Sequence, residues 1–195
     1  DNWVLRKACA DLGELSRQDC GNLKIAINCS PLTLAREELS DEISLALRSA
    51  GVEPHRLELE VTESALMGNI AETLVLLQQI RALGVSLSID DFGTGYSSLA
   101  YLKRLPLNTL KIDRSFIQDI PKSTQDMEIV QAIIVMAHTL HLQVVSEGVE
   151  TVEQLEFLET HGCDYLQGYL LSRPVPLQDL GRVLDELNQR HDRLN

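Results

Sequence analysis

The sequence predicts an α/β fold whose parallel sheet curves into a barrel. Short segments rich in Leu, Ile and Val alternate with amphipathic helical segments along the whole chain, which is typical of parallel α/β sheets. Each predicted strand also ends in polar or charged residues. Barrel enzymes gather such residues around one pocket at the C-terminal ends of their strands, whereas a doubly wound sheet concentrates its site at one switch point. Six consecutive strands with polar ends therefore favour the barrel.

The first half of the chain alternates between three helices and three strands. Apolar residues 5, 8, 12 and 15 share one helical face, so residues 3–15 are predicted to be helical. A strand follows at 23–28, then a helix at 41–50 that ends at Gly51, a residue suited to a left-handed C-cap. The next strand covers 57–63. Apolar residues 70, 74, 77 and 80 define the third helix, which Gly84 stops before a strand at 85–89.

The second half continues the same alternation. Strands are predicted at 109–112, 143–146 and 165–167. Apolar residues recur at 129, 133, 136 and 140, which indicates a helix before the fifth strand. Thr151 and Gln154 fit a capping box at the start of a helix that runs to Gly162. Apolar residues 177, 180, 184 and 187 form the stripe of a final amphipathic helix.

Composition excludes several classes of protein. The 195 residues are 44% hydrophobic and suit one globular domain. A formal net charge of −12 argues against a surface that grips polymeric nucleic acid. The longest apolar run, Ala132–Ala137, is far shorter than the roughly 20 residues of a membrane span, and the chain opens in a helical pattern, without a signal peptide. The four cysteines (Cys9, Cys20, Cys29 and Cys163) show no zinc spacing and indicate reduced thiols in the cytoplasm.

The residues at the strand ends are the candidates for chemistry. In chain order they are Asn28, Glu60 with Glu63, Asp90 with Asp91, Lys111 with Asp113, Glu147 with Glu150, and Gln167. Any one of them alone is more often a hydrogen-bonding loop residue than a ligand. Asp90 and Asp91 are more specific, because two adjacent carboxylates after an apolar run repel each other unless a cation lies between them. Carboxylates with an amide oxygen suit Mg²⁺ or Mn²⁺ rather than zinc; the alternative is a pair that caps a helix N-terminus.

Two further features adjoin the acidic pair. The segment from Gly93 to Ser98 is rich in glycine and matches neither a Walker A loop nor a dinucleotide fingerprint. Beside two carboxylates it is expected to be a mobile active-site loop. Lys111 is either an exposed edge lysine or, if it points inward at the rim, a group that holds a phosphate oxygen or an attacking water.

These residues together resemble a known family, the EAL domains. The similar segments are AINCS at 26–30, ELEVTES at 58–64, IDDFGTGYSSL at 89–99, LKIDRSFI at 110–117, SEGVET at 146–151 and QGYLLSRP at 167–174. The resemblance implies a TIM-like (β/α)8 barrel, incomplete here with about six of its eight strands. It also implies a bacterial signalling enzyme that hydrolyses cyclic-di-GMP to linear pGpG with Mg²⁺ or Mn²⁺ at a two-metal site.

The resemblance assigns roles to individual residues. It implies that Asn28, Glu60, Asp90, Asp91 and Glu147 hold metal, and that Lys111 and Glu147 are catalytic. Glu63 would anchor the loop that follows Asp91, and Asp113 and Gln167 would support the site. Substrate would be contacted by Ser97, Glu150, Arg173 and Pro174.

One departure from the family pattern lies at the N-terminus. The Glu-Ala-Leu signature, whose glutamate is a metal ligand in the family, and the first two strands are expected upstream of Trp3. Residues 1–195 are therefore expected to be one N-terminally truncated EAL domain, the missing part having been cleaved, disordered or not recorded. A fusion to GGDEF, PAS or sensor domains, a homodimer, and a cytoplasmic position (or the cytoplasmic part of a membrane-anchored protein) complete the expectation.

Two other functions compete with the phosphodiesterase. The first is a receptor that binds cyclic-di-GMP without cleaving it; degenerate family members of that kind lose metal carboxylates or the loop motif, which this chain keeps. The second is a different metal-dependent barrel enzyme, such as a lyase, which would need its own base or Schiff-base lysine.

Overall fold

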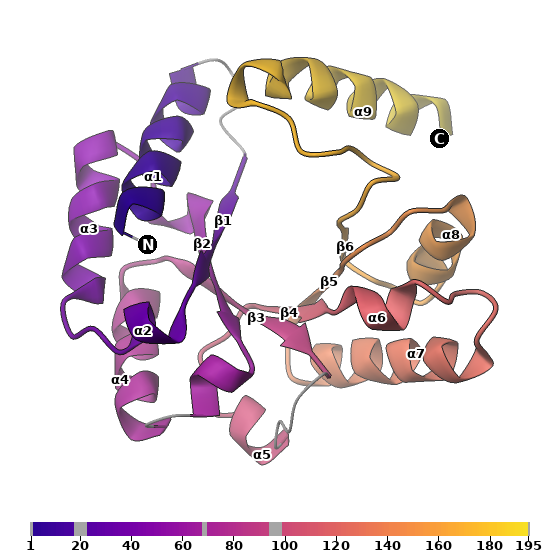
Figure 1. The fold of residues 1–195 in the computed structure, drawn as a ribbon, viewed down its shortest axis with the longest axis horizontal. Coiled ribbons are helices and arrows are strands. Elements are labelled where there is room, and N and C mark those ends of the chain that lie inside the picture. The colour runs from indigo at the N-terminus through magenta and orange to yellow at the C-terminus, as the bar shows by residue number, and fades with distance from the viewer. Residues whose placement is uncertain (1, 18–22, 68–69, 94–98, 195) are drawn as a thin grey trace.

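A computed structural model describes residues 2–17, 23–67, 70–93 and 99–194 of the chain. Its six strands are all parallel and pair in chain order, so that they form one curved sheet (Figure 1). They are β1 (Ile25–Cys29), β2 (Leu57–Thr62), β3 (Ser86–Phe92), β4 (Thr109–Ile112), β5 (Gln143–Ser146) and β6 (Tyr165–Leu166). The sheet is part of a TIM-like barrel, as the sequence predicts, and β1 and β6 form its two edges. Since every strand runs the same way, all six C-terminal strand ends lie at the same end of the barrel.

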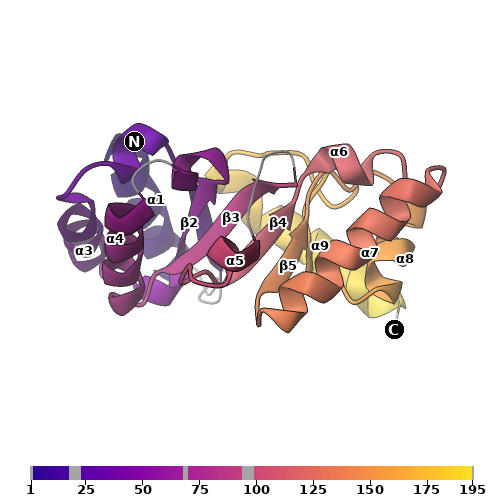
Figure 2. The ribbon, with the colours of Figure 1, turned by 90° about the horizontal axis from the view of Figure 1, so that it is seen from below.

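Most of the helices cover the outer side of this sheet, whereas α9 lies on its open side (Figures 1 and 2). The longer ones are α1 (Asn2–Arg17), α3 (Leu39–Ala50), α4 (Ile70–Ala82), α7 (Thr124–Thr139), α8 (Val152–Thr160) and α9 (Leu180–Leu194). Helix α1 packs on α3 and β1, α4 on β3, and α7 on β4 and β5. Short helices follow three strand ends or loops: α2 (Pro31–Leu34), α5 (Leu99–Leu102) and α6 (Arg114–Ile117). Short 3₁₀ turns lie at Pro54–Arg56, Ser64–Met67 and Leu177–Asp179.

The two faces of the strands differ in chemistry, and this difference positions the site. In β2, Leu57, Leu59 and Val61 are buried and belong to the apolar core, while the alternate positions are two glutamates and Thr62. Successive side chains of a strand point to opposite faces, so β2 directs leucine and valine to the helices and carboxylates to the barrel interior. Parallel register extends this division to the neighbouring strands, because Glu58 pairs with Ser86 and Glu60 with Ser88.

The lower part of the polar face is closed by an ion pair. Lys24 Nζ lies 3.0 Å from Glu58 Oε2 and donates a hydrogen bond of 3.2 Å to Ser86 Oγ. Glu58 is buried, and a buried carboxylate is costly without a partner. The ion pair therefore balances the charge of Glu58 inside the barrel. The polar residues nearer the C-terminal strand ends form an upper polar layer, which remains available for binding or catalysis.

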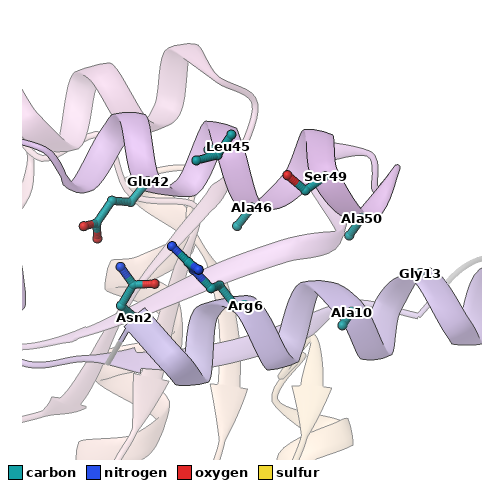
Figure 3. A pocket seen from close by; sticks show the side chains of 9 residues that line it. All are labelled: Asn2, Arg6, Ala10, Gly13, Glu42, Leu45, Ala46, Ser49 and Ala50. Atoms are coloured by element: carbon teal, nitrogen blue, oxygen red, sulfur yellow. The ribbon is translucent and has the colours of Figure 1, made fainter.

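Helices α1 and α3 approach each other closely on the outside of the sheet. A side chain at Gly13 would place its Cβ 2.9 Å from the carbonyl oxygen of Ala50, so only glycine permits this approach. Beside the contact lies an open hollow of about 490 Å³ between the two helices (Figure 3), lined by Asn2, Arg6, Ala10, Gly13, Glu42, Leu45, Ala46, Ser49 and Ala50. This hollow belongs to the helical layer and not to the strand ends.

The predicted elements are present, with shifts of a few residues at their boundaries. Gly51 is the left-handed C-cap of α3, with φ 65°, and Thr151 and Gln154 form the expected capping box of α8. Strand β3 extends to Phe92, further than the predicted 85–89, because a register shift between Ile89 and Phe92 lets both aspartates belong to it. Asp90 and Asp91 therefore lie in a strand and are not a pair that caps a helix.

Candidate metal centre

Lys111 is the centre of the upper polar layer. It lies on the inner face of β4, is 4% exposed, and its Nζ lies 2.7 Å from Glu60 Oε1, 3.1 Å from Asp90 Oδ1 and 2.5 Å from Glu147 Oε1. These three carboxylates come from β2, β3 and the residue after β5. The structure thus places Lys111 inward at the rim, not at an exposed edge, and brings four of the predicted residues into direct contact.

Negative charge exceeds positive charge in this cluster. Glu60, Asp90 and Glu147 all contact the single ammonium of Lys111, so three carboxylates share one positive charge when all are ionised. Burial raises the pKa of Glu60 and of Glu147; the hydrogen bond and charge of Lys111 lower each pKa, and neighbouring carboxylates raise it again. The net shift is upward for both, because burial and the neighbouring carboxylates together outweigh the effect of Lys111.

Lys111 itself stays protonated. Burial lowers the pKa of its ammonium, but the hydrogen bonds and charges of Glu147 and Glu60 raise it by more, and the net result lies above the ordinary value of 10.5. The main causes differ: burial raises the pKa of the carboxylates, and the adjacent carboxylates raise the pKa of the lysine. Both shifts favour a bound proton. The cluster therefore favours added positive charge.

A local distortion of β3 lets two consecutive aspartates reach the same place. Neighbouring strand residues normally point to opposite faces, but Asp91 adopts φ 55° where the register shifts, and aspartate tolerates this left-handed conformation better than most residues. One oxygen each from Asp90, Asp91 and Glu147 consequently lie within 4.8 Å of one another. Burial, Asp90 and Asp113 all raise the pKa of Asp91. Bulges of this kind commonly re-aim side chains beside active sites.

Two amide residues occupy the edges of the same layer. Asn28 on β1 pairs in register with Glu60 on β2, and its side chain is exposed at the edge of the sheet. Gln167 follows β6; its backbone N–H donates to Ser146 O at 2.8 Å and its carbonyl accepts from Val149 N at 3.0 Å. Both residues lie at the C-terminal strand ends, as predicted. Neither is an ion-pair partner of the Lys111 ammonium, whose partners are Glu60, Asp90 and Glu147.

Glu63 lies immediately after β2 and is 4% exposed. Neither of its carboxylate oxygens has a hydrogen-bond partner among the residues that the structure describes. An unsatisfied buried carboxylate is expensive, which fits the prediction that Glu63 holds the loop after Asp91. Most of that loop, including Ser97, lies outside the described residues.

The other predicted residues surround the cluster. Asp113 caps α6, its Oδ1 accepting from Ser115 N at 3.0 Å. Glu150 pairs with Arg114 at 3.0 Å, a partner that the sequence analysis did not single out. Arg173 places its guanidinium carbon 4.5 Å from the ring centre of Tyr169 and is exposed, as is Pro174.

The donor set fits divalent metal ions. Its oxygens come from carboxylates, with the amide of Asn28 in the same layer, and hard oxygen ligands of this kind suit Mg²⁺ or Mn²⁺. The excess of negative charge supplies the electrostatic reason, because paired carboxylates share a site readily only with a cation between them.

The sequence is similar to known proteins. Residues 1–174 match the family described as EAL domain. The chain is 60% identical over 184 residues to "Cyclic di-GMP phosphodiesterase NbdA" and 48% identical over 178 residues to "Bifunctional diguanylate cyclase/cyclic di-GMP phosphodiesterase MucR", both from Pseudomonas aeruginosa. These matches cover 94% and 91% of the chain, which spans about a quarter of the length of each relative (24% and 26%).

Solved structures show the same likeness. The structure titled "PaMucR Phosphodiesterase, c-di-GMP complex" superposes with a TM-score of 0.88 at 48% identity, over 92% of this chain and 72% of that one. The EAL domain of Mycobacterium smegmatis DcpA gives 0.90 at 38% identity, over 94% and 83%. A manganese and cyclic-di-GMP complex of Klebsiella pneumoniae BlrP1 gives 0.78 at 32% identity, over 87% and 44%. On fold, site and sequence, the chain belongs to the EAL domain family.

Proposed function

We propose that this chain carries out metal-dependent hydrolysis of cyclic-di-GMP to linear pGpG. The observation that carries the proposal is the cluster of three carboxylates around one buried ammonium at the C-terminal strand ends, with Asp91 close to two of them. Such a cluster favours cations, and phosphodiester hydrolysis needs cations to offset charge on the phosphoryl oxygens. The names of the relatives support the same substrate, since NbdA and MucR are both called cyclic di-GMP phosphodiesterases.

The pKa shifts and the positions of Lys111 and Glu147 favour different roles for these two residues in the proposed reaction. Because the pKa of Lys111 is raised, its ammonium donates hydrogen bonds and does not accept a proton. It can therefore hold a phosphoryl oxygen or the attacking water. Burial raises the pKa of Glu147, and its Oε1 lies 2.5 Å from the ammonium that would hold the water, so this carboxylate is placed to act as general base. In the proposed reaction Glu147 takes the proton that the attacking water loses.

The metal ligands follow from the same layer. Asn28, Glu60, Asp90, Asp91 and Glu147 would hold two divalent cations, and Mg²⁺ and Mn²⁺ both suit this oxygen set. When bound, such cations polarise phosphoryl oxygens and lower the pKa of water. Gln167, Asp113 and Glu63 would support the ligands and the loop after Asp91.

The substrate would extend from the cluster toward the loops after β5 and β6. Glu150 is held by Arg114, and Arg173 is stacked on Tyr169, so both polar groups are presented in fixed positions. With Pro174 and Ser97 they are the proposed contacts to the nucleotide.

The surrounding organisation is also proposed. Residues 1–195 would form a single EAL domain that is fused to GGDEF, PAS or sensor regions, assembles as a homodimer and works in the cytoplasm. MucR is named as a bifunctional protein, which supports fusion. In the part of the chain that the structure describes, the helices are too short or too polar to span a bilayer.

The test is hydrolysis of cyclic-di-GMP with Mg²⁺ or Mn²⁺, run on this chain and on the protein extended upstream, with chelator as the metal-free control. Formation of pGpG by the extended protein supports the proposal. Binding of the dinucleotide without cleavage would establish the receptor function instead, and the roles given to Lys111 and Glu147 would fall. A protein that neither binds nor cleaves it would refute both functions.

A further inference from the structure

Gln154 is a buried polar residue that the proposed reaction does not use. It lies in the first turn of α8 and is 3% exposed. Its Oε1 accepts hydrogen bonds from Glu150 N at 2.7 Å and from Thr151 N at 3.1 Å. Its Nε2 donates to Ile117 O at 3.1 Å. A capping box requires the contact to Thr151, but it requires neither the contact to Glu150 nor the contact to Ile117.

The extra contacts join two segments that leave the cluster. Glu150 belongs to the segment that starts with Glu147, directly after β5. Ile117 is the last residue of α6, whose cap, Asp113, lies two residues after Lys111. One buried amide therefore links the segment after β4 to the segment after β5, and the Nζ of Lys111 and the Oε1 of Glu147 lie 2.5 Å apart at the start of these two segments.

The backbone between Glu147 and Gln154 has little conformational freedom, so a shift at one end of this segment moves the other end. Glu147 N donates to Ile112 O at 3.1 Å. Gly148, with φ 69°, is packed so tightly that a Cβ there would lie 2.3 Å from Arg114 Cγ. Val149 is fully buried and uses both its N–H and its carbonyl, bonding to Gln167 O and Leu170 N at 3.0 Å each. A displacement at Glu150 is consequently passed along the segment to Glu147.

We propose that Gln154 is a positioning residue for the metal centre, which sets the separation of Lys111 and Glu147 by bridging α6 to the segment after β5. This inference rests on the proposed function of the cluster. Hydrogen-bonding groups behind metal ligands typically contribute about 10-fold to 100-fold in metal affinity, so an effect of about 10-fold is expected for a residue one step further back.

Gln154→Glu separates the bridge from the helix cap. Glutamate suits this position of a capping box, and its carboxylate can still accept from Glu150 N and Thr151 N. It has no N–H for Ile117 O and places negative charge against that carbonyl. Thr151→Ala is the matched control, because it removes the other half of the capping box and leaves the bridge to Ile117 in place.

The experiment measures the dissociation constant for Mn²⁺ by titration calorimetry, and the thermal midpoint, in the protein of full natural length. We expect about 10-fold weaker Mn²⁺ binding in Gln154→Glu with α8 retained, and unchanged Mn²⁺ binding in Thr151→Ala despite a lower midpoint. Equal Mn²⁺ affinity in Gln154→Glu and wild type would overturn the proposal.

A second variant covers the case in which the glutamate is not tolerated. Gln154→Met removes every side-chain hydrogen bond and is expected to weaken Mn²⁺ binding at least as much. If neither variant folds while Thr151→Ala does, Gln154 serves the fold and not the site, which overturns the proposal. Wild-type protein that binds Mn²⁺ but does not hydrolyse cyclic-di-GMP would refute the proposed function and leave this inference intact, because the readout is metal binding.

Discussion

Replacing Lys111 by methionine tests the charge balance of the cluster directly. The change keeps a flexible side chain of similar length and removes the only ammonium that contacts Glu60, Asp90 and Glu147 among the described residues. Removing one partner of a buried ion pair typically destabilises a protein by about 3–5 kcal/mol. We expect the lower end, about 3 kcal/mol, because the carboxylates already have raised pKa values and can take up a proton.

The assay is thermal unfolding with and without metal. For a domain of this size, about 3 kcal/mol corresponds to a fall in midpoint of roughly 6–12 °C in the metal-free protein. Mn²⁺ at 100 times its dissociation constant stabilises a folded protein by about 2.7 kcal/mol. Because the metal replaces the missing positive charge, the difference between Lys111→Met and wild type should shrink when Mn²⁺ is present, while turnover stays lost.

Lys7→Met is the control, because Lys7 makes an exposed ion pair with Asp11 on α1. Exposed pairs contribute about 0–1 kcal/mol, so this variant should unfold close to wild type at every metal concentration. A metal-free Lys111→Met protein as stable as the Lys7→Met control would refute the reasoning, since it would mean that the ammonium does not balance the carboxylates.

Three further predictions follow from the site and its supports. Asp91→Asn should reduce turnover by about 100-fold in a protein that still folds, because it removes one charge without changing shape; normal activity would contradict the two-metal assignment. The raised pKa of Glu147 means that the native protein binds more protons than the unfolded chain above the ordinary value of 4.5, so this group lowers stability as pH rises through that window. The urea midpoint of metal-free Glu147→Gln should therefore fall less than that of wild type between pH 5 and 7, and parallel curves would exclude this cause. Gly168→Ala would bring a Cβ to 2.0 Å from Val149 O and should lower the free energy of unfolding by roughly 3 kcal/mol. In the control Gly181→Ala the new Cβ meets nothing within 4 Å, so this change should stabilise α9 by up to about 1 kcal/mol. Equal effects of the two variants in calorimetry would show that the backbone approach at Gly168 is not tight.

Much of the fold could be predicted because its signals are local. Short apolar segments indicated all six strands, apolar periodicity indicated the longer helices, and Gly51 and the Thr151–Gln154 pair marked a helix end and a helix start. The short helices α2, α5 and α6 were not predicted. Each has four residues, about one turn, and a single turn shows no repeat of the apolar pattern.

The sequence predicts which residues form the site better than it predicts how they are arranged. Parallel strands bring their C-terminal ends to one edge, so Glu60, Asp90, Lys111 and Glu147 could be expected to meet. Strand alternation alone would send Asp90 and Asp91 to opposite faces, and it is the left-handed backbone at Asp91 that brings them together. Long-range contacts, such as the hydrogen bond from Gln154 to Ile117 O, leave no local trace in the sequence.

The arrangement explains why a lysine and metal ligands occupy one layer. Without metal, the carboxylates would repel one another, and the Lys111 ammonium holds three of them within 3.1 Å. The surplus of carboxylates also keeps that ammonium protonated, so it cannot serve as the base of the proposed reaction. Burial, with a contribution from the neighbouring carboxylates, raises the pKa of Glu147, which lies beside Lys111. The excess of negative charge thus attracts the cations and keeps Lys111 a hydrogen-bond donor, while burial of Glu147 suits it to accept the proton in the proposed reaction.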